Sequence, residues 1–313
     1  MPRNKLLAVL EEAKKHIFGQ DQMLESILAA LICEGHLLIE GLPGLGKTMS
    51  VSVMSRLCDL GFNRIQFTPD LLPSDLIGTM IYSPRTEQFQ TKFGPIFTQI
   101  VLADEINRSP AKVQSALLEA MAEKQVTIGE ETHKLAKPFV VLATQNPIEQ
   151  EGTYQLPEAQ LDRFMMKLYV EYPSVESELH ILNNDGVNLS SISKMFTSDD
   201  LISAQEQIDQ IYVDDKLKKK VIQIIHATRP HCDGFDNRFK DVINFGASPR
   251  AALWLIKVGK FQAFLEGKDF VSPDNILKYV KDILGHRILL SYEASTDGNN
   301  PRDIAFKIAE NIF

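Results

Sequence analysis

The beginning of the chain switches from helical to strand-like hydrophobic patterning. Apolar residues recur at three- and four-residue spacing over 6–17 and again over 22–32, which predicts two amphipathic helices. Gly19 lies between them and breaks the pattern. A short apolar run at 36–40 then ends in a glycine-rich turn, as a buried strand does. We therefore expect two helices followed by a strand.

Further apolar runs along the chain predict more strands of the same kind. Helical patterns lie between several of them, most clearly over 109–123. The alternation favours an α/β fold built on a doubly wound, mainly parallel sheet, in which ligands bind beyond the carboxyl ends of the strands. The runs are 64–67, 100–103, 139–143 and 164–169.

Two segments depart from this alternation. Residues 71–97 hold too many prolines and glycines for one regular element, and 126–135 has a hairpin pattern around Gly129. We interpret both as hairpins or loops added to the core, and refer to 71–97 as the insert and to 126–135 as the hairpin.

The hydrophobic pattern changes after Pro173 and becomes mostly helical. The clearest helical stretches are 216–228, 250–266 and 274–290. The predicted organisation is an α/β core over 1–173, carrying the insert and the hairpin, followed by a smaller all-α domain over 174–313.

The octapeptide 41–48, with the sequence GLPGLGKT, directly follows the first predicted strand. It fits the Walker A pattern, in which glycines let backbone N–H groups point at phosphate oxygens and a helix N-terminus adds a favourable dipole. Average composition gives roughly 0.01 chance matches in a chain of this length. We therefore predict ATP binding, with Lys47 reaching the β- and γ-phosphates and Thr48 placing its hydroxyl on Mg²⁺. The predicted residues in this segment are Gly41, Pro43, Gly44, Leu45, Gly46, Lys47, Thr48 and Met49.

An acidic pair, Asp104 and Glu105, ends the apolar run at 100–103. Such a pair alone is explained equally well as a surface loop. With a Walker A segment upstream, Asp104 is expected to hold Mg²⁺ and Glu105 to polarise the attacking water.

Three more polar residues follow strand or loop signals. Asn146 ends another apolar run, although an Asn-Pro pair by itself is simply a turn. Arg163 precedes the last predicted strand, where an arginine is either a surface ion pair or a finger that stabilises transition-state charge. Arg250 follows Pro249 at a predicted helix start.

Composition narrows the class of protein. The formal charge is −8, from 33 basic and 41 acidic residues, which disfavours a dedicated nucleic-acid binder. The three cysteines show no paired spacing, which disfavours disulfide bonds. No apolar run is long enough to cross a bilayer, and the first residues lead into an amphipathic stretch where a signal peptide would have an apolar core. These features predict a cytoplasmic protein. A metal site at His226, His231, Cys232 and Asp233 is disfavoured, because the set lacks a recognisable ligand spacing.

In this order, the motifs resemble the AAA+ superfamily and specifically its MoxR family of ATPases. The block from Asn146 to Phe164 is the most family-specific part. The matching segments are 41–48, 104–108, 115–121, 143–147, 149–154, 156–164 and 246–250.

The resemblance implies roles that the residues alone do not. It implies Asn146 as sensor 1, Arg163 as a finger offered to the neighbouring subunit and Arg250 as sensor 2. It places Ile17, Phe18 and Gly19 against the adenine. It also implies a helical lid, a homo-oligomeric and usually hexameric ring, a partner with a von Willebrand factor A domain, and chaperone-like remodelling or maturation of a protein.

Two other functions stay open at this stage. A nucleic-acid motor is one, because related AAA+ groups with the same type of insert include DNA helicases. A nucleotide-dependent binding switch with little turnover is the other. The acidic balance disfavours the motor, and the intact Glu105 and Arg163 disfavour the switch.

Overall fold

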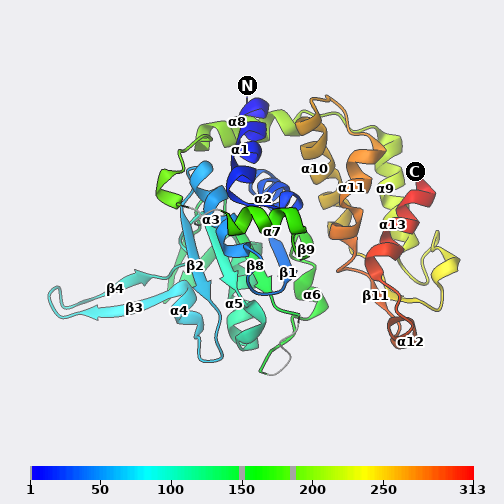
Figure 1. Ribbon diagram of the computed structural model, residues 1–313. Helices are drawn as coiled ribbons and strands as arrows, with labels where there is room; N and C mark the ends of the chain where they lie inside the picture. Colours follow the sequence, from blue (N-terminus) through cyan, green and yellow to red (C-terminus); the bar gives the residue numbers. More distant parts are fainter. Residues whose placement is uncertain (1, 148–151, 184–187) are drawn as a thin grey trace. The chain divides into compact units, whose positions relative to one another are not determined.

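The computed structural model describes residues 2–147, 152–183 and 188–313 (Figure 1). Contacts between Cα atoms divide the chain into two compact units. The core unit comprises Ala8–Arg163 and Leu168–Ser198, and the C-terminal unit comprises Met1–Leu7, Phe164–Lys167 and Asp199–Phe313.

The core unit extends past residue 173, where a boundary was expected. The reason is local: the backbone N–H groups of Met195 and Phe196 donate to the carbonyl of Leu57, and Lys194 pairs with Asp59 at 2.7 Å. Residues up to 198 are thereby held to the α/β layer although their sequence pattern is helical.

A five-stranded sheet forms the centre of the core unit, in the order β2-β5-β8-β1-β9, and β2, β5, β8 and β1 run parallel to one another. This confirms the predicted doubly wound α/β class. β5 is buried along its whole length and β8 along all but its last residue, which is why their sequences are apolar runs without alternation. The strands are β1 (Leu37–Gly41), β2 (Phe62–Gln66), β5 (Ile100–Asp104), β8 (Val140–Gln145) and β9 (Met166–Val170).

Helices flank this sheet, as the alternating pattern predicted. α2 is buried over ten of its thirteen residues, since it packs against the sheet as well as against α3. The helices of this part of the chain are α1 (Pro2–His16), α2 (Asp21–Cys33), α3 (Lys47–Leu57), α5 (Ala111–Glu123), α6 (Glu158–Leu161) and α7 (Val175–Leu182), with 3-10 turns η1 (Ile106–Arg108) and η2 (Leu189–Ser191).

The broken segment at 71–97 folds as a short helix, α4 (Pro73–Ile77), followed by a hairpin of β3 (Gly78–Ser83) and β4 (Gln88–Phe93). The base of the hairpin needs two glycines, because a Cβ on Gly94 would lie 2.2 Å from the Leu76 carbonyl and one on Gly78 as close to the Lys92 carbonyl. Figure 1 shows this hairpin extending away from the sheet.

The second hairpin forms where its pattern predicted it. β6 (Gln125–Ile128) pairs with β7 (Glu131–Lys134) in antiparallel register around Gly129. An edge-to-face contact between Phe93 and His133, with ring centroids 5.0 Å apart, joins the two hairpins.

The C-terminal unit is mainly helical. One difference from the expectation is that α11 ends at Leu284, because Leu289–Leu290 leaves the helical pattern to form β11 against β10 (Ile243–Phe245). The helices are α8 (Ser198–Asp209), α9 (Asp215–Ala227), α10 (Pro249–Glu266), α11 (Pro273–Leu284), α12 (Tyr292–Thr296) and α13 (Pro301–Ile312), with the 3-10 turn η3 (Asn237–Phe239). Within the described ranges, no helix combines the length and the apolar character that crossing a bilayer requires.

Candidate nucleotide-binding site

The loop between β1 and α3 is shaped by glycines. Gly44 and Gly46 adopt positive φ angles of 85° and 76°, which side chains rarely tolerate. A Cβ built on either would meet nothing within 4 Å, so the loop surrounds open space. Gly41 is required for a different reason. A Cβ at this position would lie 3.0 Å from the Cβ of Val170, so the close packing of β1 against β9 leaves no room for a side chain. The loop is thus a backbone cradle that leads into the N-terminus of α3.

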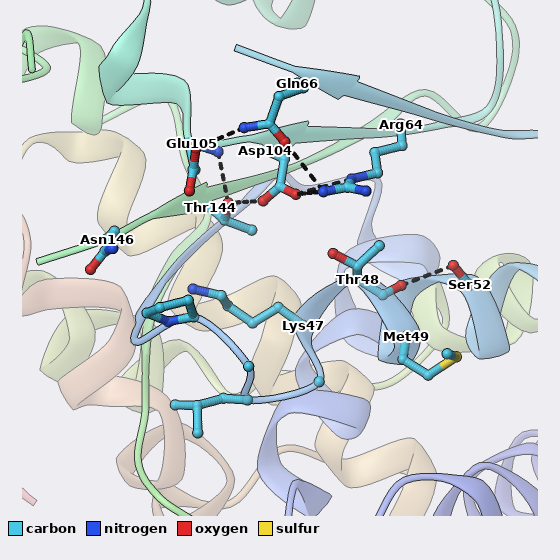
Figure 2. Close-up of a pocket in the computed structure, with 14 residues that line it drawn as sticks. Lys47, Thr48, Met49, Ser52, Arg64, Gln66, Asp104, Glu105, Thr144 and Asn146 are labelled. Atoms are coloured by element: carbon cyan, nitrogen blue, oxygen red, sulfur yellow. Dashed lines mark hydrogen bonds and ion pairs between the residues drawn. The ribbon is translucent and has the colours of Figure 1, made fainter. Parts of the chain in front are cut away.

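This loop forms one wall of a cleft of about 450 Å³ in the core unit (Figure 2). The opposite wall consists of the carboxyl ends of β2, β5 and β8, as expected for a doubly wound sheet. The lining residues are Pro43, Gly44, Leu45, Gly46, Lys47, Thr48, Met49, Ser52, Arg64, Gln66, Asp104, Glu105, Thr144 and Asn146. The structure therefore brings most of the predicted site residues around one cavity.

Lys47 is the cation of the loop. Its Nζ donates to the Gly41 carbonyl, which keeps the side chain folded back along the loop (Figure 2). Burial lowers the pKa of Lys47, and the charges of Asp104 and Glu105 act in the opposite direction. An anionic ligand in the cleft would replace the missing solvation of this ammonium group.

Asp104 is the most enclosed carboxylate of the cleft, with 8% of the residue exposed. Its Oδ1 accepts a 2.6 Å hydrogen bond from the Thr144 hydroxyl. Its Oδ2 accepts from Nε and Nη2 of Arg64, at 3.0 and 2.6 Å. The pairing of Ala103 with Ala143 aligns β5 and β8 so that Asp104 and Thr144 follow side by side.

Glu105 adopts a left-handed backbone conformation, with φ 57°. A non-glycine residue in this region costs on the order of 1 kcal/mol and is found preferentially at functional sites. Its N–H donates to the Thr144 hydroxyl at 2.9 Å, and its carboxylate accepts from Gln66 at 2.7 Å. Arg108 lies 3.2 Å from the same carboxylate. Glu105 lies beside Asp104 among the residues that line the cleft (Figure 2).

Four lining residues were not among the sequence predictions: Ser52, Arg64, Gln66 and Thr144. Arg64 and Gln66 are polar residues two apart on a predicted strand, so they share one face, and this period-two signal could have found them. Thr144 lies two residues before Asn146 at the end of an apolar run, a signal of the same kind. The hydroxyl of Ser52 donates to the Thr48 carbonyl at 2.9 Å within α3, and no pattern pointed to it.

The residues predicted beside adenine do not line the cleft. Ile17 is buried and Phe18 stacks on the ring of His180 in α7, with centroids 5.3 Å apart. A Cβ on Gly19 would lie 2.8 Å from the Ser177 hydroxyl. The segment is therefore packed on α7, and its contact with a base stays a prediction.

Two predicted arginines lie elsewhere. Arg163 donates to the Leu118 carbonyl at 3.3 Å in the core unit and does not line the cleft. Arg250 belongs to the first turn of α10 in the C-terminal unit, where its N–H donates to the Ser248 hydroxyl at 3.2 Å. Their roles as finger and sensor 2 stay predictions. Part of one family-like segment, 149–151, lies outside the described residues.

The histidines and Cys232 at 226–233 do not gather around a common point. His226 instead approaches the Asp233 carbonyl at 3.4 Å, and His231 has a positive φ of 66° in the connecting turn. In the part of the chain that the structure describes, no three His, Cys, Asp or Glu side chains are grouped to hold a metal ion.

Comparison with family models gives two matches. Residues 36–166 match the ATPase family associated with various cellular activities (AAA). Residues 236–308 match the AAA lid domain. The first match covers the phosphate loop and both carboxylates, and the second lies within the C-terminal unit.

Three known proteins are similar in sequence to this chain over nearly its whole length. The chaperone MoxR1 of Mycobacterium tuberculosis is 44% identical over 301 residues, which is 96% of this chain and 80% of that protein. The protein YeaC of Bacillus subtilis is 42% identical over 291 residues, covering 92% and 88%. A crystal structure of a protein assigned as an ATPase, from Cytophaga hutchinsonii, is 47% identical and superimposes with a TM-score of 0.91, covering 99% and 94%.

Proposed function

This chain belongs to the MoxR family of AAA ATPases, and from that premise we propose that it binds ATP with Mg²⁺ in the cleft and hydrolyses it. The observation that carries the proposal is the convergence of Lys47, Thr48, Asp104, Glu105 and Asn146 around one cavity of about 450 Å³. That volume lies within the range of small-molecule and nucleotide sites.

The cradle of the loop fits a triphosphate. Its backbone N–H groups and the α3 dipole would bind phosphate oxygens, and Lys47 would turn from the Gly41 carbonyl to the β- and γ-phosphates. Thr48 and Asp104 offer hydroxyl and carboxylate oxygens, which is the donor chemistry that Mg²⁺ takes together with phosphate oxygens. When bound, Mg²⁺ would neutralise charge on the β- and γ-phosphates.

The remaining polar residues would each have a separate role in hydrolysis. Glu105 would orient and polarise the attacking water, with its carboxylate held by Gln66 until nucleotide arrives. Asn146 would hydrogen-bond the γ-phosphate or the water. Arg163 would complete the site of a neighbouring subunit and Arg250 would contact the phosphates from the lid, so that hydrolysis depends on assembly.

The biological output that we propose is chaperone-like remodelling or maturation of a protein partner in the cytoplasm by a homo-oligomeric, hexameric ring. Support comes from a relative named as a chaperone and from exposed large apolar side chains on the β3–β4 hairpin, a surface suited to contacts with protein. They are Met80, Ile81, Tyr82, Phe89 and Phe93. We propose an adaptor with a von Willebrand factor A domain as the partner.

Steady-state ATPase activity measured across protein concentration tests this proposal. We expect specific activity to rise with concentration in the wild type and to fall by about a hundredfold or more in Glu105→Gln. Glu123→Gln is the matched control, because it makes the same substitution at an exposed residue at the end of α5. This variant should keep full activity. Activity that is strictly proportional to protein would contradict the shared site. ATP binding without turnover would instead support the nucleotide-dependent switch.

A further inference from the structure

Arg64 and Asp104 both line the cleft and form an ion pair there. Two of the donating atoms of Arg64, Nε at 3.0 Å and Nη2 at 2.6 Å, point at the same oxygen, Oδ2 (Figure 2). The other oxygen, Oδ1, accepts from Thr144. The guanidinium therefore makes a fork on one oxygen and leaves the Thr144 contact undisturbed.

The two members of this pair are anchored very differently. The side chain of Asp104 is 12% exposed and is fixed at the end of a buried strand, whereas that of Arg64 is 51% exposed on the edge strand β2. Movement of Arg64 away from Asp104 therefore requires no change in the core. Its Nη2 also donates to Gln66 at 3.2 Å, a contact that a rotated side chain can lose at little cost, because solvent replaces it.

The charges that line the cleft determine how Arg64 responds to a bound metal ion. The cleft contains two cationic side chains, Lys47 and Arg64, and two carboxylates, Asp104 and Glu105. A divalent cation bound to Asp104 would lie close to the guanidinium, which contacts the same carboxylate. The two positive charges would repel each other. A triphosphate in the same cleft would offer the guanidinium new acceptors.

We propose that Arg64 is a place-holding counter-cation, which neutralises Asp104 before metal arrives and which Mg²⁺ must displace from Oδ2. This inference rests on the proposed function, because it concerns the order and strength of metal binding at the same site. It assigns Arg64 a role in setting the affinity for metal, which no sequence motif indicated.

A purely structural ion pair is the opposing explanation. In that case Arg64 would only tie β2 to β5, and its loss would lower stability without any effect on metal affinity. The two explanations differ in how the protein responds to Mg²⁺ when nucleotide binding is measured directly.

The test uses the full chain and a fluorescent ATP analogue. Binding is first measured in EDTA and then as a function of Mg²⁺, which gives the Mg²⁺ concentration at half-saturation. We expect Arg64→Gln to lower that concentration about three- to tenfold, since the competing cation is gone. Arg64→Lys keeps the charge without the fork and should fall between Arg64→Gln and the wild type. Arg85→Gln removes one charge from the exposed turn between β3 and β4 and should match the wild type.

The outcomes separate this inference from the function on which it rests. An unchanged half-saturating Mg²⁺ concentration in both Arg64 variants, with analogue binding in EDTA intact, would overturn the counter-cation role alone. A wild-type chain that binds no analogue with or without Mg²⁺ would overturn the proposed function and the inference with it. Thermal melting of each variant shows whether it is folded, and Arg64→Lys serves if Arg64→Gln does not fold.

Discussion

Thr144 and Asp104 form a 2.6 Å hydrogen bond between neighbouring strands, and this bond orders the acidic end of the cleft. The same hydroxyl accepts the N–H of Glu105 at 2.9 Å. With 1% of its surface exposed, Thr144 has no access to bulk water that could replace either bond. One buried side chain therefore positions both carboxylates of the site.

Thr144→Val should impair catalysis more than nucleotide binding. Valine keeps the shape but leaves Oδ1 of Asp104 without its donor and the Glu105 N–H without an acceptor, at a cost of about 1–3 kcal/mol in stability. We expect the maximal ATPase rate to fall about ten- to hundredfold, as for residues that orient metal ligands. Affinity for an ATP analogue in EDTA should stay the same. Thr144→Ser, which keeps the hydroxyl, is the control, and equal losses in both variants would contradict the role.

The finger role of Arg163 predicts complementation between two inactive variants. Arg163→Ala retains Glu105, whereas Glu105→Gln retains Arg163, so neighbouring copies of the two variants form an intact site in one direction around a ring. In a mixture of equal parts we expect roughly a quarter of wild-type ATPase activity, although each variant alone is inactive. Each variant should elute as the same assembly as the wild type on size exclusion. Full activity of Arg163→Ala alone would exclude the finger.

The sequence was sufficient to predict the parallel sheet and the second hairpin, for physical reasons visible in particular residues. The apolar runs at 100–103 and 139–143 have no polar alternation because β5 and β8 are covered on both sides. The motif at 41–48 constrains its own backbone, since Gly44 and Gly46 must take positive φ. The carboxyl-end rule then placed Asp104, Glu105 and Asn146 on the same edge.

Contacts between distant segments could not be predicted in the same way. Arg64 joins Asp104 only because β2 and β5 are neighbours in the sheet, and strand order is not written in the local pattern. The insert at 71–97 was interpreted as a hairpin or loop added to the core, but its pattern did not locate the two strands, whose base is marked by Gly78 and Gly94. The helical periodicity after residue 173 similarly gave no sign that Met195 and Phe196 bond to Leu57.

His36 should make the core unit sensitive to acid. Complete burial lowers the pKa of this histidine from 6.5 to about 4, and its neutral ring accepts the Val141 N–H at 3.0 Å while facing the Met121 carbonyl at 3.3 Å. Between these two pKa values the unfolded chain binds a proton that the folded chain does not. Stability from His36 is therefore complete above pH 6.5 and is lost as the pH falls towards 4, by about 3 kcal/mol in total.

Thermal unfolding of the wild type and His36→Gln from pH 8 to pH 4 checks this effect. Burial also lowers the pKa of His286 in the C-terminal unit, so both proteins should lose stability in acid. The difference between them isolates His36: the wild type should exceed the variant most at neutral pH, and the gap should narrow on acidification. A gap that is independent of pH would show that His36 does not titrate in this range.

Gly246 should be essential for the fold of the C-terminal unit because the chain passes directly over Thr228. A Cβ at Gly246 would lie 2.1 Å from the Thr228 carbonyl oxygen and 2.7 Å from its hydroxyl, which accepts the Ala247 N–H at 3.0 Å. Backbone cannot yield as a side chain does, so Gly246→Ala should cost about 3 kcal/mol or more. Gly298→Ala is the matched control, because it has a positive φ of 79° but open space around its Cβ, and should cost only about 1 kcal/mol. Denaturant unfolding of both variants measures the difference, and equal losses would mean that crowding against Thr228 is relieved by a local shift.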